Sequence, residues 1–131
     1  VLEGVPKSLP AIVKAFRIQE KVRGIGFDWD NKSQIWEKVL EEIRELKVEV
    51  EKKNKERIES EFGDVLFALI NYARFINVNP EDALERCNKR FIKRFQIMEK
   101  KLKDEEKDLS DMNLEEMEKY WQWAKNEYLN T

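Results

Sequence analysis

The sequence predicts an all-α protein: a helical bundle of about five helices in a single domain over residues 1–131, preceded by a linker-like stretch over residues 1–7. Apolar residues recur every three or four positions along most of the chain. The 131 residues include only four glycines and three prolines, too few for the turns of a many-stranded sheet. Charged residues make up 40%, but the regular apolar spacing argues against disorder.

The first helix is expected to begin at Ser8, a residue type that caps helices, and to accept Pro10 in its first turn. Gly24 is expected to end it. The following loop contains glycine and two aromatic residues, Phe27 and Trp29. Aromatic side chains in such a loop either stack on a base or close the edge of a core, and the sequence leaves both readings open.

The second helix is expected to be capped by Asn31 or Ser33 and to run to about Lys53. Its predicted apolar stripe consists of Ile35, Val39, Ile43, Leu46 and Val50. The third helix is expected over about residues 55–76. Because residues 65–70 are apolar on all sides, we expect this helix to lie at the centre of the bundle.

The fourth helix is expected to start at Pro80, with Asn79 as its cap, and to continue to about Leu102. Proline suits the first helical position because the amide hydrogen that it lacks would have no partner there. A polar connection over residues 104–108 then leads to a last helix that starts at Asn113.

Composition excludes several classes of site. The chain has no histidine, so histidine-based triads and imidazole zinc sites are excluded. The single Cys87 cannot form an internal disulfide, which fits a cytoplasmic protein. No apolar run approaches about 18 residues, so no membrane partner is expected. The net charge of −2 argues against nucleic-acid binding.

Four carboxylates on the second and third helices form the candidate metal site. Glu42 and Glu45 are three residues apart, as are Glu61 and Asp64, so each pair shares one face of its helix. Glu61 and Asp64 stand where the third helix enters the core, and desolvated neighbouring carboxylates repel one another. Oxygen ligands of this kind suit Mg²⁺ or Mn²⁺. The alternative is that these are solvated acidic faces.

These residues also match a family. The chain resembles the MazG nucleoside triphosphate pyrophosphohydrolases, specifically their second domain, within the all-α NTP pyrophosphatase group. The group also contains the dimeric dUTPases and the phosphoribosyl-ATP pyrophosphohydrolases. The matching segments, in order, are Leu9-Pro-Ala with Gln19, Gly26-Phe-Asp-Trp29, Lys38-x-x-Glu41-Glu42-x-x-Glu45, Glu61-Phe-Gly-Asp64, Asn79-Pro-Glu, Asn88-Lys-Arg-Phe-x-x-Arg94 and Trp121-x-x-x-Lys125.

The resemblance implies a reaction and roles for these residues. The reaction is Mg²⁺-dependent hydrolysis of a nucleoside triphosphate between the α- and β-phosphates, with Mn²⁺ as an alternative ion. The implied metal ligands are Glu42, Glu45, Glu61 and Asp64. The implied substrate-binding residues are Lys38, Asn88, Arg90, Arg94, Trp121 and Lys125. Since histidine is absent, Glu41 or Glu45 is the candidate base that activates water.

Other functions and states remain open. One alternative is a narrower enzyme specific for dUTP, dCTP or phosphoribosyl-ATP, and another is a non-catalytic helical interaction module with a vestigial acidic cluster. The long apolar segment of the third helix and the resemblance both imply a homodimer or a higher homo-oligomer. A start without methionine leads us to expect that the chain is a fragment of a two-domain protein.

Overall fold

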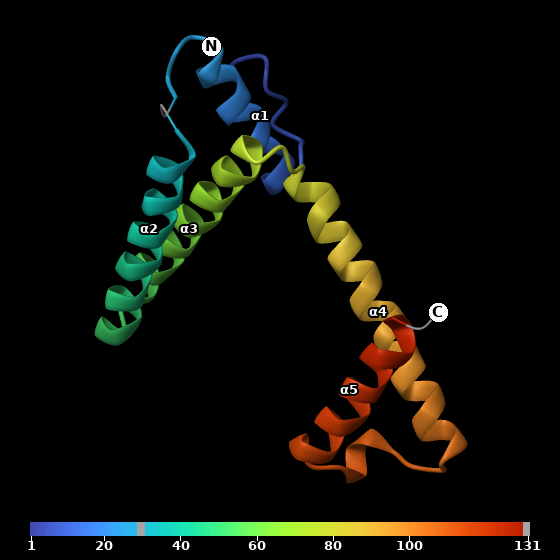
Figure 1. Ribbon diagram of the computed structural model, residues 1–131. Coiled ribbons are helices and arrows are strands. Elements are labelled where there is room, and N and C mark those ends of the chain that lie inside the picture. Colours follow the sequence, from blue (N-terminus) through green and yellow to red (C-terminus); the bar gives the residue numbers. More distant parts are fainter. Residues whose placement is uncertain (29–30, 130–131) are drawn as a thin grey trace. The chain divides into compact units, whose positions relative to one another are not determined.

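The computed structural model describes residues 1–28 and 31–129, and its regular structure is helical throughout. Trp29, one of the two loop aromatics, lies outside the described residues. The elements are α1 (Ala11–Arg23), α2 (Lys32–Lys52), α3 (Lys55–Phe75), α4 (Pro80–Asp104), a short 3₁₀ turn η1 (Leu109–Asp111) and α5 (Leu114–Leu129) (Figure 1). The chain divides into two compact units, Val1–Ala83 and Leu84–Thr131. The all-α prediction is confirmed.

The start of α1 differs from the prediction. Pro10, with φ −54° and ψ 146°, is the cap, and Ser8 lies in a turn before the helix. A helix capped by Ser8 would require Leu9 to be helical, and a residue that directly precedes proline is disfavoured in that conformation. The first helical hydrogen bond therefore runs from Lys14 N to Pro10 O, at 2.8 Å. Gly24 ends α1 as expected.

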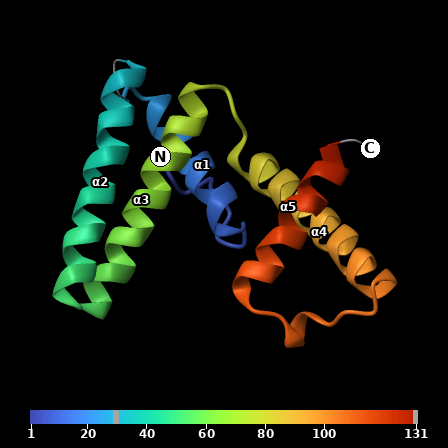
Figure 2. The same cartoon turned by 60° about the horizontal axis from the view of Figure 1, so that its bottom comes forward.

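In the first unit, α2 and α3 form an antiparallel pair that lies side by side in both views (Figures 1 and 2). Asn31 caps α2 by accepting a hydrogen bond from Gln34 N at 3.1 Å. Asn54 caps α3 in the same way, and Lys53 between the helices has a left-handed φ of 59°. The short connection makes α2 and α3 antiparallel neighbours, which brings acidic residues of both helices together.

The buried face of α2 has a different register from the predicted stripe. Ile35 and Val39 are fully buried as expected. Ile43 and Val50, however, are 43% and 50% exposed, whereas the preceding residues of each, Glu42 and Glu49, are buried. The inward-facing positions are Ile35, Val39, Glu42, Leu46 and Glu49. The spacing between successive inward-facing positions alternates between four and three residues and averages three and a half, which is the period of a helix that packs along one partner helix. Two of these inward-facing positions hold the acids Glu42 and Glu49.

The apolar segment of α3 is only partly covered within this unit. Val65, Ala68 and Ile70 are buried, but Leu66, Phe67 and Leu69 are all at least 40% exposed. The expectation that residues 65–70 are buried on every side is therefore wrong for the first unit taken alone. In this unit α1 and α2 pack on α3, and two helices do not surround a third.

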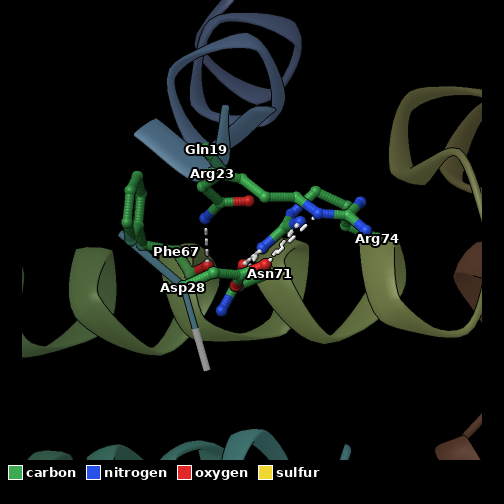
Figure 3. A network of polar contacts seen from close by, with 6 residues as sticks. All are labelled: Gln19, Arg23, Asp28, Phe67, Asn71 and Arg74. Carbon is green, nitrogen blue, oxygen red and sulfur yellow. Dashed lines mark hydrogen bonds and ion pairs between the residues drawn. The ribbon is translucent and has the colours of Figure 1, made fainter. Parts of the chain in front are cut away.

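A polar network ties the end of α1 and the following loop to α3 (Figure 3). Gly26 adopts φ +91°, a conformation that glycine reaches without steric cost, and the chain turns back so that Asp28 faces α3. Asp28 accepts two hydrogen bonds from Arg74, at 2.8 and 3.4 Å, and pairs with Arg23 at 3.3 Å. Arg74 also donates to Asn71 Oδ1 at 2.8 Å. This fork fixes the loop against α3.

The second unit contains most of α4 together with η1 and α5. Asn79 caps α4 as predicted, accepting hydrogen bonds from Glu81 N and Asp82 N. The core of the unit consists of Met98 and Leu102 from α4 and Ala124 from α5, with several half-buried aromatic residues around it. Within residues 1–28 and 31–129, no helix combines the length and the apolar character needed to cross a membrane.

Candidate functional site

Three glutamates of the first unit bring their carboxylates together. Glu42 and Glu45 come from α2, one turn apart, and Glu61 comes from the facing part of α3. One carboxylate oxygen of each lies within 4.8 Å of the others. The antiparallel packing of α2 on α3 produces this carboxylate cluster, because the inward register of α2 places Glu42 toward the neighbouring helix.

Burial makes it energetically costly for the glutamates of the carboxylate cluster to carry their charges. Glu42 is 7% exposed, Glu61 is half-buried and Glu45 is exposed. Oε2 of Glu42 and Oε2 of Glu61 are both buried, and neither has a hydrogen-bond partner within the described part of the chain. A buried acceptor without a donor costs about 1–3 kcal/mol, and more when it carries a charge.

Lys38 supplies part of the missing positive charge. Its Nζ lies 3.0 Å from Glu42 Oε1 and 3.7 Å from Glu41 Oε1, one turn away on α2. The hydrogen bond to Glu42 raises the pKa of Lys38 above its usual range. Lys38 therefore neutralises one oxygen of Glu42, while the other oxygen has no hydrogen-bond partner among residues 1–28 and 31–129.

The negative charge of the carboxylate cluster also affects the protonation of Glu45. The neighbouring Glu42 carboxylate raises the pKa of Glu45, with further contributions from desolvation and from Glu61. Like charges held this close favour protonation of one member. A cation bound among these carboxylates would relieve the same crowding.

The three residues fit a divalent metal ion. They offer only hard carboxylate oxygens, which Mg²⁺ and Mn²⁺ prefer. Oε2 of Glu42 and Oε2 of Glu61, which have no partner in the part of the chain that the structure describes, are the positions where a cation would remove the cost of desolvation. This donor set is thus a candidate metal centre on chemical grounds.

Three other predicted residues lie beside the carboxylate cluster. Asp64 is exposed, one turn further along α3, and is not a member of the group of three, so its role as a ligand stays a prediction. Glu41 is exposed on α2, and Lys38 holds it at 3.7 Å. A Cβ atom added at Gly63, between Glu61 and Asp64, would meet no atom of the described chain within 4 Å. The surface of α3 is therefore open next to the cluster.

The remaining predicted residues belong to the second unit. Asn88 and Arg90 are exposed on α4. Arg94 is half-buried, with its guanidinium carbon 5.2 Å from the centre of the Tyr128 ring. Trp121 packs against Phe91 with ring centres 5.0 Å apart. Lys125 is half-buried on α5, one turn after Trp121. This unit thus combines cations with aromatic rings, and their roles in binding stay predictions.

Sequence reasoning gave no role to the polar network of Figure 3. Gln19 is 4% exposed and Arg74 is 9% exposed, so both are buried polar side chains in the same unit as the carboxylate cluster. Asp28 and Arg74 are 46 residues apart. The spacing of residues along the sequence does not predict a pair so far apart. The polar Gln19 on the partly apolar α1 could, however, have indicated a buried polar contact.

Comparison with known proteins matches more than half of the chain to one family. Residues 31–98, more than half of the chain, match the model of the MazG nucleotide pyrophosphohydrolase domain. This segment begins at the cap of α2 and contains the carboxylate cluster, Asp64 and the predicted cations of α4. Trp121 and Lys125 lie beyond it.

Curated relatives resemble nearly the whole chain. A Thermotoga maritima protein named nucleoside triphosphate pyrophosphohydrolase/pyrophosphatase MazG is 40% identical, over 89% of this chain and 45% of its own length. The nucleoside triphosphate pyrophosphohydrolase of Escherichia coli is 34% identical, over 98% of this chain and 50% of its own. The Bacillus subtilis protein YabN is 48% identical, over 95% of this chain and 26% of its own. The chain thus spans about half the length of the first two relatives.

Proposed function

Because this chain belongs to the MazG nucleotide pyrophosphohydrolase family, we propose that it hydrolyses nucleoside triphosphates between the α- and β-phosphates, releasing a nucleoside monophosphate and pyrophosphate. The observation that carries the proposal is the carboxylate cluster of Glu42, Glu45 and Glu61. A triphosphate is strongly anionic, so an acidic site favours it only through bridging cations.

The proposed resident ion is Mg²⁺, with Mn²⁺ as an alternative. Glu42, Glu45 and Glu61 would hold it, with Asp64 as a fourth ligand from the next turn of α3. A bound divalent cation acts as a Lewis acid toward phosphate oxygens and stabilises the charge that develops during hydrolysis. The buried Oε2 atoms of Glu42 and Glu61, which accept no hydrogen bond from any described residue, support this assignment.

The chain's own carboxylates are the proposed proton acceptors. Attack on a phosphorus atom requires that water lose a proton, and an exposed glutamate can accept it. Glu45 and Glu41 are the two candidates. A carboxylate that holds the ion is a poor proton acceptor, so Glu45 can act as the base only if it does not ligate the ion, whereas Glu41 lies outside the carboxylate cluster.

Cations and aromatic residues are proposed to bind the rest of the nucleotide. Lys38 is within ion-pair distance of the cluster's Glu42 and can turn toward a phosphate once another cation satisfies this carboxylate. In the second unit, Arg94 and Lys125 are proposed to meet the outer phosphates, together with Asn88, Arg90 and Trp121. Arginine suits this role because its planar guanidinium binds phosphate through two donors.

The test is hydrolysis of a panel of ribo- and deoxyribonucleoside triphosphates with Mg²⁺, measuring monophosphate, pyrophosphate and orthophosphate separately. The proposal expects monophosphate and pyrophosphate in equal amounts, and no turnover when the divalent ion is chelated. Orthophosphate as the first product would contradict the cleavage position.

The same panel separates the alternatives. Hydrolysis of dUTP, dCTP or phosphoribosyl-ATP alone would indicate a narrow specificity. No turnover of any compound would contradict the enzymatic function and would favour the helical interaction module.

We also propose that the chain forms a homodimer or a higher homo-oligomer. Several large apolar side chains of α2 and α3 are at least 40% exposed in the first unit, namely Trp36, Ile43, Val50, Phe62, Leu66, Phe67 and Leu69. Exposed apolar surface of this extent is typical of an association surface. Light scattering is expected to give at least twice the mass of one chain. Replacing Leu66 by Glu is expected to lower this mass, and a monomeric wild-type chain would contradict the proposal.

A further inference from the structure

One exposed line of side chains along α4 is almost entirely cationic. The members of this line follow one another at alternating steps of three and four residues, and they are Arg86, Lys89, Lys93, Gln96, Lys100 and Lys103. Such steps keep side chains in a line along one side of a helix. The five cations of this line are hereafter the basic stripe. The stripe extends over about 25 Å of α4, at 1.5 Å per residue.

Within the second unit, the basic stripe lies on the side of α4 opposite to α5. Phe91 packs against Trp121 of α5 with ring centres 5.0 Å apart, and Met98 belongs to the core that α4 forms with α5. Lys93 and Lys100 each follow one of these two α4 residues by two positions, which is about 200° of rotation around the helix. The packing of this unit therefore leaves the basic stripe exposed to solvent.

The charge of the basic stripe is not neutralised by the described acids. Residues 86–98 contain no aspartate or glutamate. Among residues 1–28 and 31–129, no carboxylate lies within ion-pair distance of a cation of the stripe. The neighbouring Lys101, by contrast, pairs with Glu105 at 3.4 Å. Five cations held in one line repel one another, and a polyanion bound along the line would relieve this repulsion.

The chemistry of the basic stripe favours a nucleic-acid duplex over other polyanions. The core of a protein interface is depleted in charged residues, whereas the stripe has no apolar member. A helix that binds a membrane buries its apolar side in lipid, but the apolar side of α4 packs on Ala124 of α5. Single strands stack their bases on aromatic side chains, and the stripe has none. A duplex presents regularly spaced phosphates and needs only cations.

We propose that the basic stripe binds the phosphate backbone of a nucleic-acid duplex independently of its base sequence. DNA and RNA duplexes share this chemistry. The net charge of −2 argued against such a partner, but it is a sum over the whole chain, and charges farther away than about 10 Å are largely screened at about 0.1 M salt. The proposal does not rest on the proposed hydrolysis, because no residue of the stripe belongs to the carboxylate cluster or to the residues proposed to bind the nucleotide.

The test is the fluorescence anisotropy of labelled duplexes of about 20 base pairs, titrated with the whole chain over about 50–200 mM salt. A DNA duplex and an RNA duplex of the same sequence are measured in parallel. We expect the logarithm of the binding constant to fall linearly with the logarithm of the salt concentration, with a slope of about −4.5 if each of the five cations contacts one phosphate. Binding of either duplex supports the proposal, and the one bound more tightly identifies the source of the phosphates.

Two matched variants assign the binding to the basic stripe. The stripe variant changes Lys89, Lys93 and Lys100 to glutamine, and its slope is expected to be smaller in magnitude by about 2.7, which is about 0.9 for each lost contact. Its affinity at about 50 mM salt is expected to fall at least tenfold. The control variant makes the same change at three exposed lysines of the first unit and is expected to leave the slope unchanged; these are Lys47, Lys52 and Lys55.

Several results would overturn the proposal. The first is no binding of either duplex at the lowest salt concentration, and the second is an equal loss of affinity in the stripe and control variants. Tighter binding of a single strand of the same length would show that the partner is not a duplex. Equally tight binding of polyglutamate, or of vesicles of phosphatidylglycerol, would show that the stripe does not distinguish a duplex from other anionic surfaces. These comparisons use the wild-type chain, so they decide even if a variant does not fold.

Discussion

Replacing Glu61 by glutamine is expected to lower kcat/KM for nucleoside triphosphate hydrolysis by about 10²–10³-fold, the loss that follows when one charge-stabilising group is removed from an active site. Glutamine has nearly the same shape, so α3 should retain its packing. The loss would arise because one of the three carboxylates that meet within 4.8 Å would no longer carry a charge.

The same variant is expected to be more stable than the wild type in metal-free buffer, by roughly 1 kcal/mol in the free energy of unfolding. Oε2 of Glu61 is buried and has no donor among the residues that the structure describes, and Glu42 and Glu45 lie beside it. An amide removes the repulsion and can donate to a neighbouring carboxylate. The gain should disappear when Mg²⁺ is added, because only the wild type then gains stability from binding.

Glu59→Gln is the matched control, since Glu59 is an exposed acid on α3 outside the carboxylate cluster. It is expected to change neither kcat/KM nor the free energy of unfolding by a measurable amount. A Glu61→Gln chain that hydrolyses as fast as Glu59→Gln would contradict the role of Glu61. Chemical denaturation followed by circular dichroism supplies the stability measurement.

Replacing Arg74 by alanine is expected to destabilise the first unit by about 3 kcal/mol, at the lower end of the range for breaking a buried ion pair. The side chain of Arg74 is only 6% exposed, and it binds both oxygens of Asp28 as well as Asn71. Its removal leaves Asp28, whose side chain is 19% exposed, with a weaker partner in Arg23.

Arg23→Ala tests the same carboxylate from its exposed side. Arg23 is 61% exposed and lies 3.3 Å from Asp28, so its removal is expected to cost no more than about 1 kcal/mol. Urea denaturation of both variants measures the difference. Equal effects of Arg74→Ala and Arg23→Ala would contradict the view that the buried fork, rather than net charge near Asp28, fixes the loop on α3.

The start of a helix could be predicted from the sequence where residues within one turn of it determine that start. Asn79 and Pro80 mark the start of α4 because a cap and a fixed φ act within one turn. Ser8 failed as a cap for an equally local reason, the restriction that Pro10 places on Leu9. The ends of these helices were therefore determined by interactions between residues that are close together in the sequence.

The register of α2 depended on tertiary packing instead. Apolarity alone selected Ile43 and Val50 for the core, but the structure buries Glu42 and Glu49 and exposes the two apolar residues. Glu49 lies 3.8 Å from Arg57 of α3, while one oxygen of Glu42 has no partner within the described ranges 1–28 and 31–129. No hydrophobic pattern indicates that an acid occupies a core position, because such a position depends on the partner helix.

The carboxylate cluster was predictable because helical spacing joins Glu42 to Glu45 and a short connection makes α2 and α3 antiparallel. The polar network that ties α1 and its loop to α3 was not predictable in the same way. Gln19 reaches Phe67 across 48 residues and Asp28 reaches Arg74 across 46. Such contacts arise only once α1 and its loop pack on α3, which no local pattern specifies.

Calorimetric titration of the metal-free chain with Mn²⁺ and Mg²⁺ tests the central claim most directly, namely that Glu42, Glu45 and Glu61 form a divalent metal centre. The wild-type chain is expected to bind at least one ion per chain, and the chain with all three residues changed to glutamine is expected to bind none at the same site. Equal binding by the two chains, or no binding by the wild type in the presence of a nucleoside triphosphate, would contradict the claim.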